Sequence, residues 1–234
     1  MCKRMFKKRG ERMDFRHEVK HEINLSDMFE IRQRLRAVTY PDPHAVDGKY
    51  LIRSLYFDNL YDKALMEKIN GLSRREKFRI RYYNGDTSVI HLEKKSKFDH
   101  LGNKQSAPLS KEEAQSIVDG NIDWMPDSEY PVVRELYSKM KIQGLAPKTI
   151  VDYTREPFIF PAGNVRVTLD YNVRSGMYCT DFLNPDCITV PVSEAIILEV
   201  KWDGFLPDII RDVVALEDRR EGAFSKYETC RIYG

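Results

Sequence analysis

Four stretches of the chain alternate ionisable and apolar side chains with a period of two residues. They lie at residues 16–22, 77–81, 90–95 and 198–201; in the second, for example, Arg79 and Arg81 flank Ile80. Because successive side chains of a strand point to opposite faces, each stretch predicts a strand with one apolar and one charged face. The charged faces are either solvated outer surfaces or the lining of a shared, water-filled interior that binds a charged ligand.

The rest of the chain predicts further strands joined by short helices and turns. Strands are expected at residues 15–23, 50–57, 76–83, 87–95, 148–155, 164–173 and 195–202. Helices are expected to start near Ser26, Tyr61, Ser110, Pro131 and Pro207. The polar residues 98–108 are interpreted as a mobile loop, and residues 224–233 as a loop or short strand.

Hairpins and short helices between strands are typical of an antiparallel α+β domain. Strands with one apolar and one charged face suit a β-barrel tunnel of about eight strands, with helices packed outside and a wet interior. Residues 1–13 are basic, lack the apolar segment of a signal peptide and are expected to form a disordered arm. Residues 14–234 show no linker and no repeat, so they are interpreted as one domain.

The composition is that of a globular protein without a strong overall charge. Hydrophobic residues make up 42% of the 234 residues, and the net charge is +2, which gives no general case for nucleic-acid binding. No apolar run reaches the length of a membrane span. No CxxC spacing occurs among the four cysteines, which argues against zinc and for reduced thiols in a cytosolic protein. These are Cys2, Cys179, Cys187 and Cys230.

The charged faces carry the residue types that bind phosphate. Arg79 and Arg81 lie two residues apart, so both can point inward and hold phosphoryl oxygens on several sides. The other basic side chains at suitable strand positions are Lys20, Lys95, Arg155, Arg166 and Lys201. Glu199 is the first candidate for a ligand of Mg²⁺ or Mn²⁺, because these ions prefer oxygen ligands. Second candidates are Glu18, Glu93 and Asp170.

Each of these residues also has a purely structural interpretation. A single Glu-x-Lys pair on a strand usually belongs to a charge ladder on a solvated face, and Arg166 with Asp170 fits that description. The recurrence of charged faces opposite apolar ones favours a shared site instead. The aromatic pair Tyr56 and Phe57 is interpreted as core. The sequence has no glycine-rich phosphate loop of the P-loop or dinucleotide-binding type, and no nucleophile elbow of the type found in α/β-hydrolases.

Eight short motifs, in this order, resemble those of the catalytic domain of the VTC (vacuolar transporter chaperone) family. That domain is a polyphosphate polymerase of the triphosphate tunnel metalloenzyme superfamily, and the resemblance covers about residues 15–227. The motifs are Arg16-His-Glu-Val-Lys20, Ser54-Leu-Tyr-Phe-Asp58, Lys77-Phe-Arg-Ile-Arg81, His91-Leu-Glu-Lys-Lys95, Tyr153-Thr-Arg155, Arg166-Val-Thr-Leu-Asp170, Leu198-Glu-Val-Lys201 and Phe224-Ser-Lys-Tyr227. Each motif is weak alone, whereas eight in one order are specific.

The resemblance implies a tunnel that admits a nucleoside triphosphate and is lined by basic residues. It implies catalytic roles for Arg79, Arg81, Lys95 and Lys226. It implies phosphate-binding roles for Lys20, Arg155 and Arg166, which Lys201 and Lys104 are expected to join. Glu199 would hold the metal ion, Mn²⁺ or Mg²⁺.

The activity that the resemblance implies is transfer of the terminal phosphoryl group of a nucleoside triphosphate, ATP, to a polyphosphate chain. The alternatives are a triphosphatase on the same fold and a non-catalytic polyphosphate-binding module. Arg16 replaces the first glutamate of the superfamily's Glu-x-Glu-x-Lys motif, which favours the polymerase. Large family members also carry a phosphate-sensing domain and membrane helices. This chain shows neither, so we expect a cytoplasmic protein that depends on a separate membrane protein for polyphosphate export.

Overall fold

A computed structural model describes residues 16–98, 101–216, 219 and 221–234 of the chain. The predicted basic arm, residues 1–13, lies outside the described residues. One antiparallel sheet pairs eight strands in the order β1-β10-β8-β7-β3-β4-β5-β6. Their bounds are β1 (Arg16–Ile23), β3 (Tyr50–Asp58), β4 (Arg74–Tyr83), β5 (Asp86–Phe98), β6 (Leu101–Leu109), β7 (Ala146–Phe160), β8 (Val165–Ser175) and β10 (Ile196–Asp203). Two short strands, β2 (Tyr40–Pro41) and β9 (Val190–Ser193), pair with β7 and β8.

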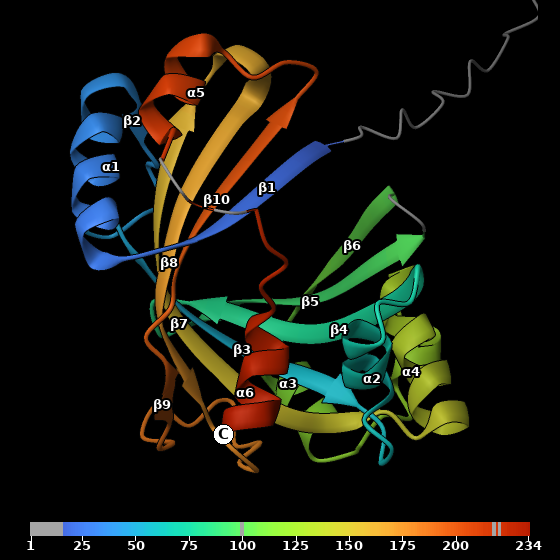
Figure 1. The fold of residues 1–234 in the computed structure, drawn as a ribbon. Helices are drawn as coiled ribbons and strands as arrows, with labels where there is room; N and C mark the ends of the chain where they lie inside the picture. The colour runs from blue at the N-terminus through green and yellow to red at the C-terminus, as the bar shows by residue number, and fades with distance from the viewer. Residues whose placement is uncertain (1–15, 99–100, 217–218, 220) are drawn as a thin grey trace, which may run out of the picture.

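The sheet curls into a half-barrel, whose inner face opens between β1 and β6 (Figure 1). These two strands are its edges, and their described residues do not pair with each other. The predicted α+β class and the eight antiparallel strands are thus confirmed. In β1, β4, β5 and β10 one face is mainly apolar and the other is charged, and the curvature of the sheet gathers these charged side chains on the concave face.

Within the part of the chain that the structure describes, six α-helices accompany the sheet, and two pairs of them cover its apolar, convex face. Their bounds are α1 (Leu25–Val38), α2 (Lys63–Ile69), α3 (Lys111–Val118), α4 (Pro131–Gln143), α5 (Asp208–Val214) and α6 (Lys226–Tyr233). α1 and α5 pack over one half of the sheet around Leu198, and α3 and α4 over the other half around Ile80. None of the described helices is both long and apolar enough to cross a membrane.

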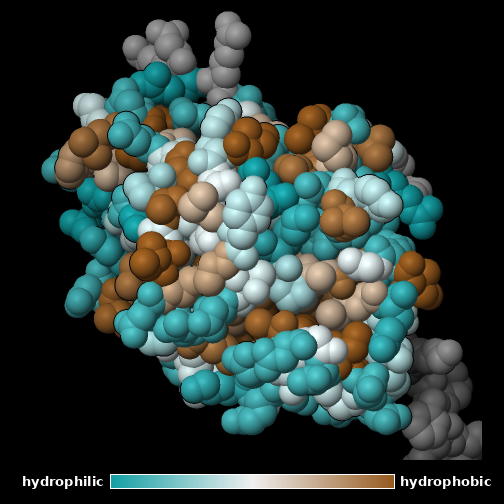
Figure 2. Space-filling model, turned by 90° about the horizontal axis from the view of Figure 1, so that it is seen from below, coloured by the Kyte–Doolittle hydropathy of each residue, from teal (hydrophilic) through white to brown (hydrophobic). Residues whose placement is uncertain are grey.

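Side-chain caps explain where two of the helices start. Ser110 and Glu113 form the capping box at the start of α3, as the sequence predicts. α1 begins earlier than predicted, because the cap is Asn24, which exchanges hydrogen bonds with Asp27, and not Ser26. Seen from below, exposed hydrophobic residues are scattered among hydrophilic ones (Figure 2).

Two predicted elements were wrong. Residues 101–108, expected within a loop over residues 98–108, belong to the edge strand β6 (Leu101–Leu109), which pairs with β5 along its length. Residues 226–233, expected as loop or short strand, form helix α6. This helix lies on the concave side of the sheet. Its residue Lys226 pairs with Asp170 on β8, and the ring of Tyr227 stacks on that of Tyr56 on β3.

Candidate functional site

On the concave face, β1 and β10 bring two carboxylates and two lysines together. Their register places Lys20 opposite Glu199 and Glu18 opposite Lys201. Lys20 Nζ lies 2.5 Å from Glu18 Oε1 and 3.1 Å from Glu199 Oε1, while Lys201 Nζ lies 3.3 Å and 2.8 Å from the same two side chains. Burial would raise the pKa of Glu199, yet Lys201, Arg155 and Lys20 hold it well below its usual value. Glu199 is therefore an anion surrounded by cations.

The second cluster surrounds Asp170 on β8, which is 1% exposed. Arg155 on β7 donates two hydrogen bonds to its carboxylate, at 2.6 Å and 2.7 Å, and Lys226 on α6 donates a third at 2.7 Å. Burial would raise the pKa of Asp170, but Arg155 and Lys226 lower it strongly. Arg155 also lies 3.5 Å from Glu199, so the two clusters are continuous.

The third cluster surrounds Glu93 on β5. Arg79 on β4 donates to it through Nε at 2.7 Å, Lys104 on β6 lies 2.5 Å away, and Arg81 lies 3.9 Å away. Burial opposes ionisation, but these three cations lower the pKa of Glu93. The two arginines also donate to neutral oxygens: Arg79 to the Tyr56 hydroxyl at 2.8 Å, and Arg81 to Ser54 Oγ at 2.9 Å and the Tyr153 hydroxyl at 3.1 Å.

A row of three lysines crosses β4, β5 and β6. Lys77 pairs with Lys95, and Lys95 with Lys104, in the strand register. No carboxylate of the described residues forms an ion pair with Lys77 or Lys95, although like charges on paired strands repel each other. The positive charge of Arg79 and, after it, partial loss of solvation lower the pKa of Lys95 well below its usual value, although this side chain still reaches water. Burial lowers the pKa of Lys77. Such a row favours an anionic ligand.

Thirteen ionisable side chains make up what we call the concave cluster. Nine are cations: Lys20, Lys77, Arg79, Arg81, Lys95, Lys104, Arg155, Lys201 and Lys226. Four are carboxylates: Glu18, Glu93, Asp170 and Glu199. The excess of positive charge on one curved surface suits a ligand with several negative charges spread along its length, such as a triphosphate or a longer phosphate chain.

The structure thus brings together nine of the ten site residues that the sequence analysis singled out; their functional roles stay predictions. Arg166, the tenth, lies on the same face, opposite Lys201 in the strand register, and its guanidinium pairs with Asp42 of the segment between β2 and β3 at 3.2 Å. Tyr56 lies in the core, as predicted, but its hydroxyl also accepts a hydrogen bond from Arg79, a role that was not predicted. A signal was present: Ser54 and Tyr56 lie two residues apart and so share a face of β3.

Glu18 and Glu199 fit a divalent cation. Lys20 Nζ already lies between their carboxylates, which shows that this position attracts positive charge. The described residues contain no group of three or more His, Cys, Asp or Glu side chains suited to a metal. Mg²⁺ is commonly held by one or two carboxylates, with phosphate oxygens and water completing its shell, and this pair would meet that need.

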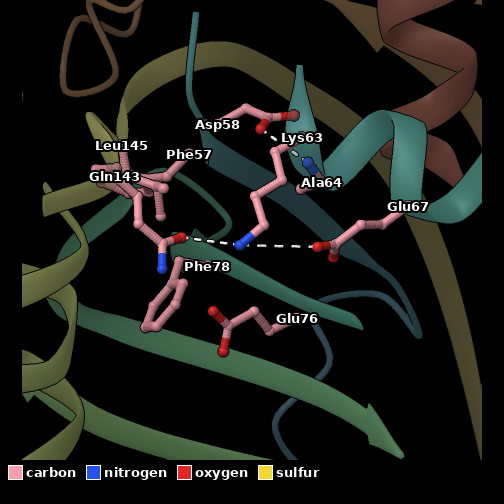
Figure 3. Close-up of a pocket in the computed structure, with 9 residues that line it drawn as sticks. All are labelled: Phe57, Asp58, Lys63, Ala64, Glu67, Glu76, Phe78, Gln143 and Leu145. Atoms are coloured by element: carbon pink, nitrogen blue, oxygen red, sulfur yellow. Dashed lines mark hydrogen bonds and ion pairs between the residues drawn. The ribbon is translucent and has the colours of Figure 1, made fainter. Parts of the chain in front are cut away.

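A small pocket beside α2 is a different feature from the concave cluster (Figure 3). It is lined by Asp58, Lys63 and Glu67 among others, and its free volume is about 10 Å³. That volume holds one water molecule at most, so it is no substrate site.

Comparisons with known proteins identify a family but no substrate. A family profile described as the VTC domain matches residues 15–232. None of the curated proteins matches the sequence. Similar solved structures include a Bacillus halodurans protein assigned provisionally as an adenylate cyclase, with 13% identity, 86% of each chain covered and a TM-score of 0.47. The PH1819 protein of Pyrococcus horikoshii has 16% identity over 86% of this chain and 84% of its own, with a TM-score of 0.42.

Proposed function

Because the chain belongs to the VTC domain family, we propose that it is a polyphosphate polymerase that uses a nucleoside triphosphate, ATP. The observation that carries this proposal is the excess of cations in the concave cluster, above all the row formed by Lys77, Lys95 and Lys104. Repulsion within that row is relieved when an extended polyanion lies along it. A phosphate chain has the required charge and shape.

In the proposed reaction an oxygen of the acceptor phosphate attacks the terminal phosphorus of the triphosphate. The bond from that phosphorus to the bridging oxygen breaks, and a nucleoside diphosphate leaves. Arg79 and Arg81 are held at fixed positions by Tyr56, Ser54 and Tyr153, so they stabilise charge on the transferring group without first having to reorganise. No protein nucleophile is needed.

The other cations of the concave cluster would contact further phosphates along the bound chain. Arg155 and Lys226 neighbour the arginine pair through Asp170 and Tyr153, and Lys20 and Lys201 surround Glu199. Glu199 with Glu18 would hold Mn²⁺ or Mg²⁺, which supplies charge neutralisation and orientation of phosphate oxygens. Water and the acceptor compete for the same phosphorus, so the triphosphatase is the closest alternative reaction.

We further propose that the protein acts in the cytoplasm and that a separate membrane protein exports the product. Purified protein from which membrane partners are absent should then still make polyphosphate. Synthesis by the purified protein would show that polymerisation does not require export.

The experiment incubates the purified protein with ATP and Mn²⁺ and resolves the products on a gel stained for polyphosphate. A ladder of chains is expected from the unmodified protein, none from Glu199→Gln, and an unchanged ladder from Glu194→Gln, which alters an exposed glutamate. Free phosphate without chains would favour the triphosphatase. Tight binding of triphosphate without any turnover would favour the binding module.

A further inference from the structure

The first turn of α6 places three successive residues in the concave face. Lys77 donates to Ser225 Oγ at 3.1 Å, Lys226 Nζ lies 2.7 Å from Asp170 Oδ2, and the Tyr227 ring stacks on Tyr56 with 4.9 Å between ring centroids. Successive residues of a helix point in different directions around its axis. The position and rotation of this turn therefore decide where the ammonium group of Lys226 lies.

A buried hydrogen bond ties that turn to the end of β3. The Tyr227 hydroxyl donates to Asp58 Oδ2 at 2.6 Å, and both residues are only 1% exposed. Burial, reinforced by the Asp58 carboxylate, raises the pKa of Tyr227, so the hydroxyl keeps its proton and remains a donor.

Asp58 is itself held rigidly at the end of β3. Its Oδ1 accepts the backbone N–H groups of Asn59 and Ala64, both at 2.9 Å, and its Oδ2 accepts that of Leu65 at 3.1 Å. Figure 3 shows this carboxylate directed at the first turn of α2. Asp58 thus joins a strand of the sheet, the start of α2 and the start of α6.

The other polar contacts between α2 and α6 lie nearer the solvent. Arg231 pairs with Asp62 at 2.8 Å and Lys68 with Glu228 at 3.4 Å, and Asp62 and Glu228 are 29% and 24% exposed. Partly exposed ion pairs contribute little to holding one geometry. Among the polar contacts of α6 with α2 and the residues just before it, that of Tyr227 with Asp58 is the most deeply buried.

We propose that Tyr227 is a positioning residue for phosphate binding: its hydroxyl, held by Asp58, fixes the start of α6 so that Lys226 reaches the bound phosphate. The inference rests on the proposed function only in taking a triphosphate as ligand. Tyr227 itself does not touch phosphate. Its effect should therefore pass through Lys226, and this distinguishes it from a residue that merely stabilises the fold.

The test is a double-mutant cycle with Tyr227→Phe, which keeps the stacked ring, and Lys226→Ala. Binding of inorganic tripolyphosphate is measured by calorimetry, at a temperature well below the unfolding midpoint of every variant. We expect each single variant to raise the Kd about tenfold, and Tyr227→Phe to add less than about twofold when Lys226 is already alanine. Tyr233→Phe, on the same helix and 72% exposed, is the matched control and should bind as the unmodified protein does.

The dependence of binding on salt gives a second, independent measurement. Loss of the Lys226 contact reduces the number of ionic contacts, so Tyr227→Phe and Lys226→Ala should lower the slope of log Kd against log salt by similar amounts. A variant that only loosens the fold keeps the slope of the unmodified protein. Effects that add in the double variant, or a Tyr227→Phe variant with unchanged Kd, would overturn the inference.

Calorimetry needs no turnover, so failure of this inference is distinguishable from failure of the proposed function. Non-additive variants of a protein that binds tripolyphosphate but makes no polyphosphate would support the inference and refute the polymerase. Additive effects of the two substitutions in a protein that does make polyphosphate would refute the inference and support the polymerase.

Discussion

Replacing Glu93 with glutamine should destabilise the free protein and, at the same time, tighten its binding of tripolyphosphate. Glu93 is 3% exposed, and its carboxylate pairs with Arg79 at 2.6 Å, Lys104 at 2.5 Å and Arg81 at 3.9 Å. Glutamine keeps the size of the side chain and one acceptor oxygen but removes the negative charge. The three cations then repel one another until a phosphate ligand arrives.

The magnitude follows from the burial of this cluster. Removing one partner of a buried ion pair costs about 3–5 kcal/mol. The Lys104 side chain is 52% exposed, so water screens part of the repulsion and we take the lower end, about 3 kcal/mol. In a chain of this size about 1 kcal/mol corresponds to roughly 2–4 °C, so the Tm should fall by about 6–12 °C. Binding that is stronger by about 1.4 kcal/mol would lower the Kd about tenfold.

Thermal unfolding with and without tripolyphosphate measures the first effect, and calorimetry measures the second. Glu194→Gln, which removes the same charge from an exposed position, is the control and should change neither quantity. The ligand should return part of the lost Tm in Glu93→Gln, because it binds only the folded state. An unchanged Tm combined with weaker binding would refute the reasoning, since Glu93 would then assist the ligand directly and not compete with it.

Three further predictions address the lysine row, the buried acids and the cysteines. Lys95→Met should raise the Tm of the free protein by removing like-charge repulsion while weakening tripolyphosphate binding; a lower Tm would contradict this. Because the folded state lowers the pKa of Asp170, its contribution to stability is complete above the ordinary carboxyl value of about 4 and is lost as the pH falls. Urea unfolding below pH 4 should therefore show a steeper loss of free energy for the unmodified protein than for Asp170→Asn, and parallel losses would count against it. The sulfurs of Cys179 and Cys187 lie 2.9 Å apart, and burial raises the pKa of Cys187 to about 12. Oxidised dithiothreitol should therefore convert these two thiols to a disulfide faster at pH 9 than at pH 7, because the reacting species is the thiolate. A Cys187→Ser variant that still loses two titratable thiols would disprove the pairing.

Which side chains share a face could be predicted from the sequence, because the period of two fixes it along each strand. Arg79 and Arg81, and likewise Glu199 and Lys201, lie on the same faces as expected. Which acid meets which base could not be predicted in this way. The contact of Lys104 with Glu93 depends on the register of β5 and β6 and on the curvature of the sheet, and neither is visible in a single strand.

The two wrong elements have separate physical causes. β6 is an edge strand with Gly102 and Pro108, residues that are typical of turns, and it is held by its pairing with β5. In α6, tyrosine, threonine and isoleucine have modest helix propensity, and the helix is stabilised by packing of Tyr227 and Cys230. The spacing of Ser225 and Glu228 is a helix-start signal that the sequence did contain.

The concave cluster holds nine cations against four carboxylates, whereas the whole chain has a net charge of only +2, so the residues outside the cluster are net negative. A polyanion is therefore attracted more strongly to this surface than to the rest of the protein. Within that surface, Glu93 and Asp170 neutralise the arginines that we propose bind phosphate. Binding then exchanges one set of anions for another, and affinity follows from the difference between the two sets of ion pairs. This is why removing Glu93 should strengthen the binding of tripolyphosphate, whereas removing Lys95 or Lys226 should weaken it.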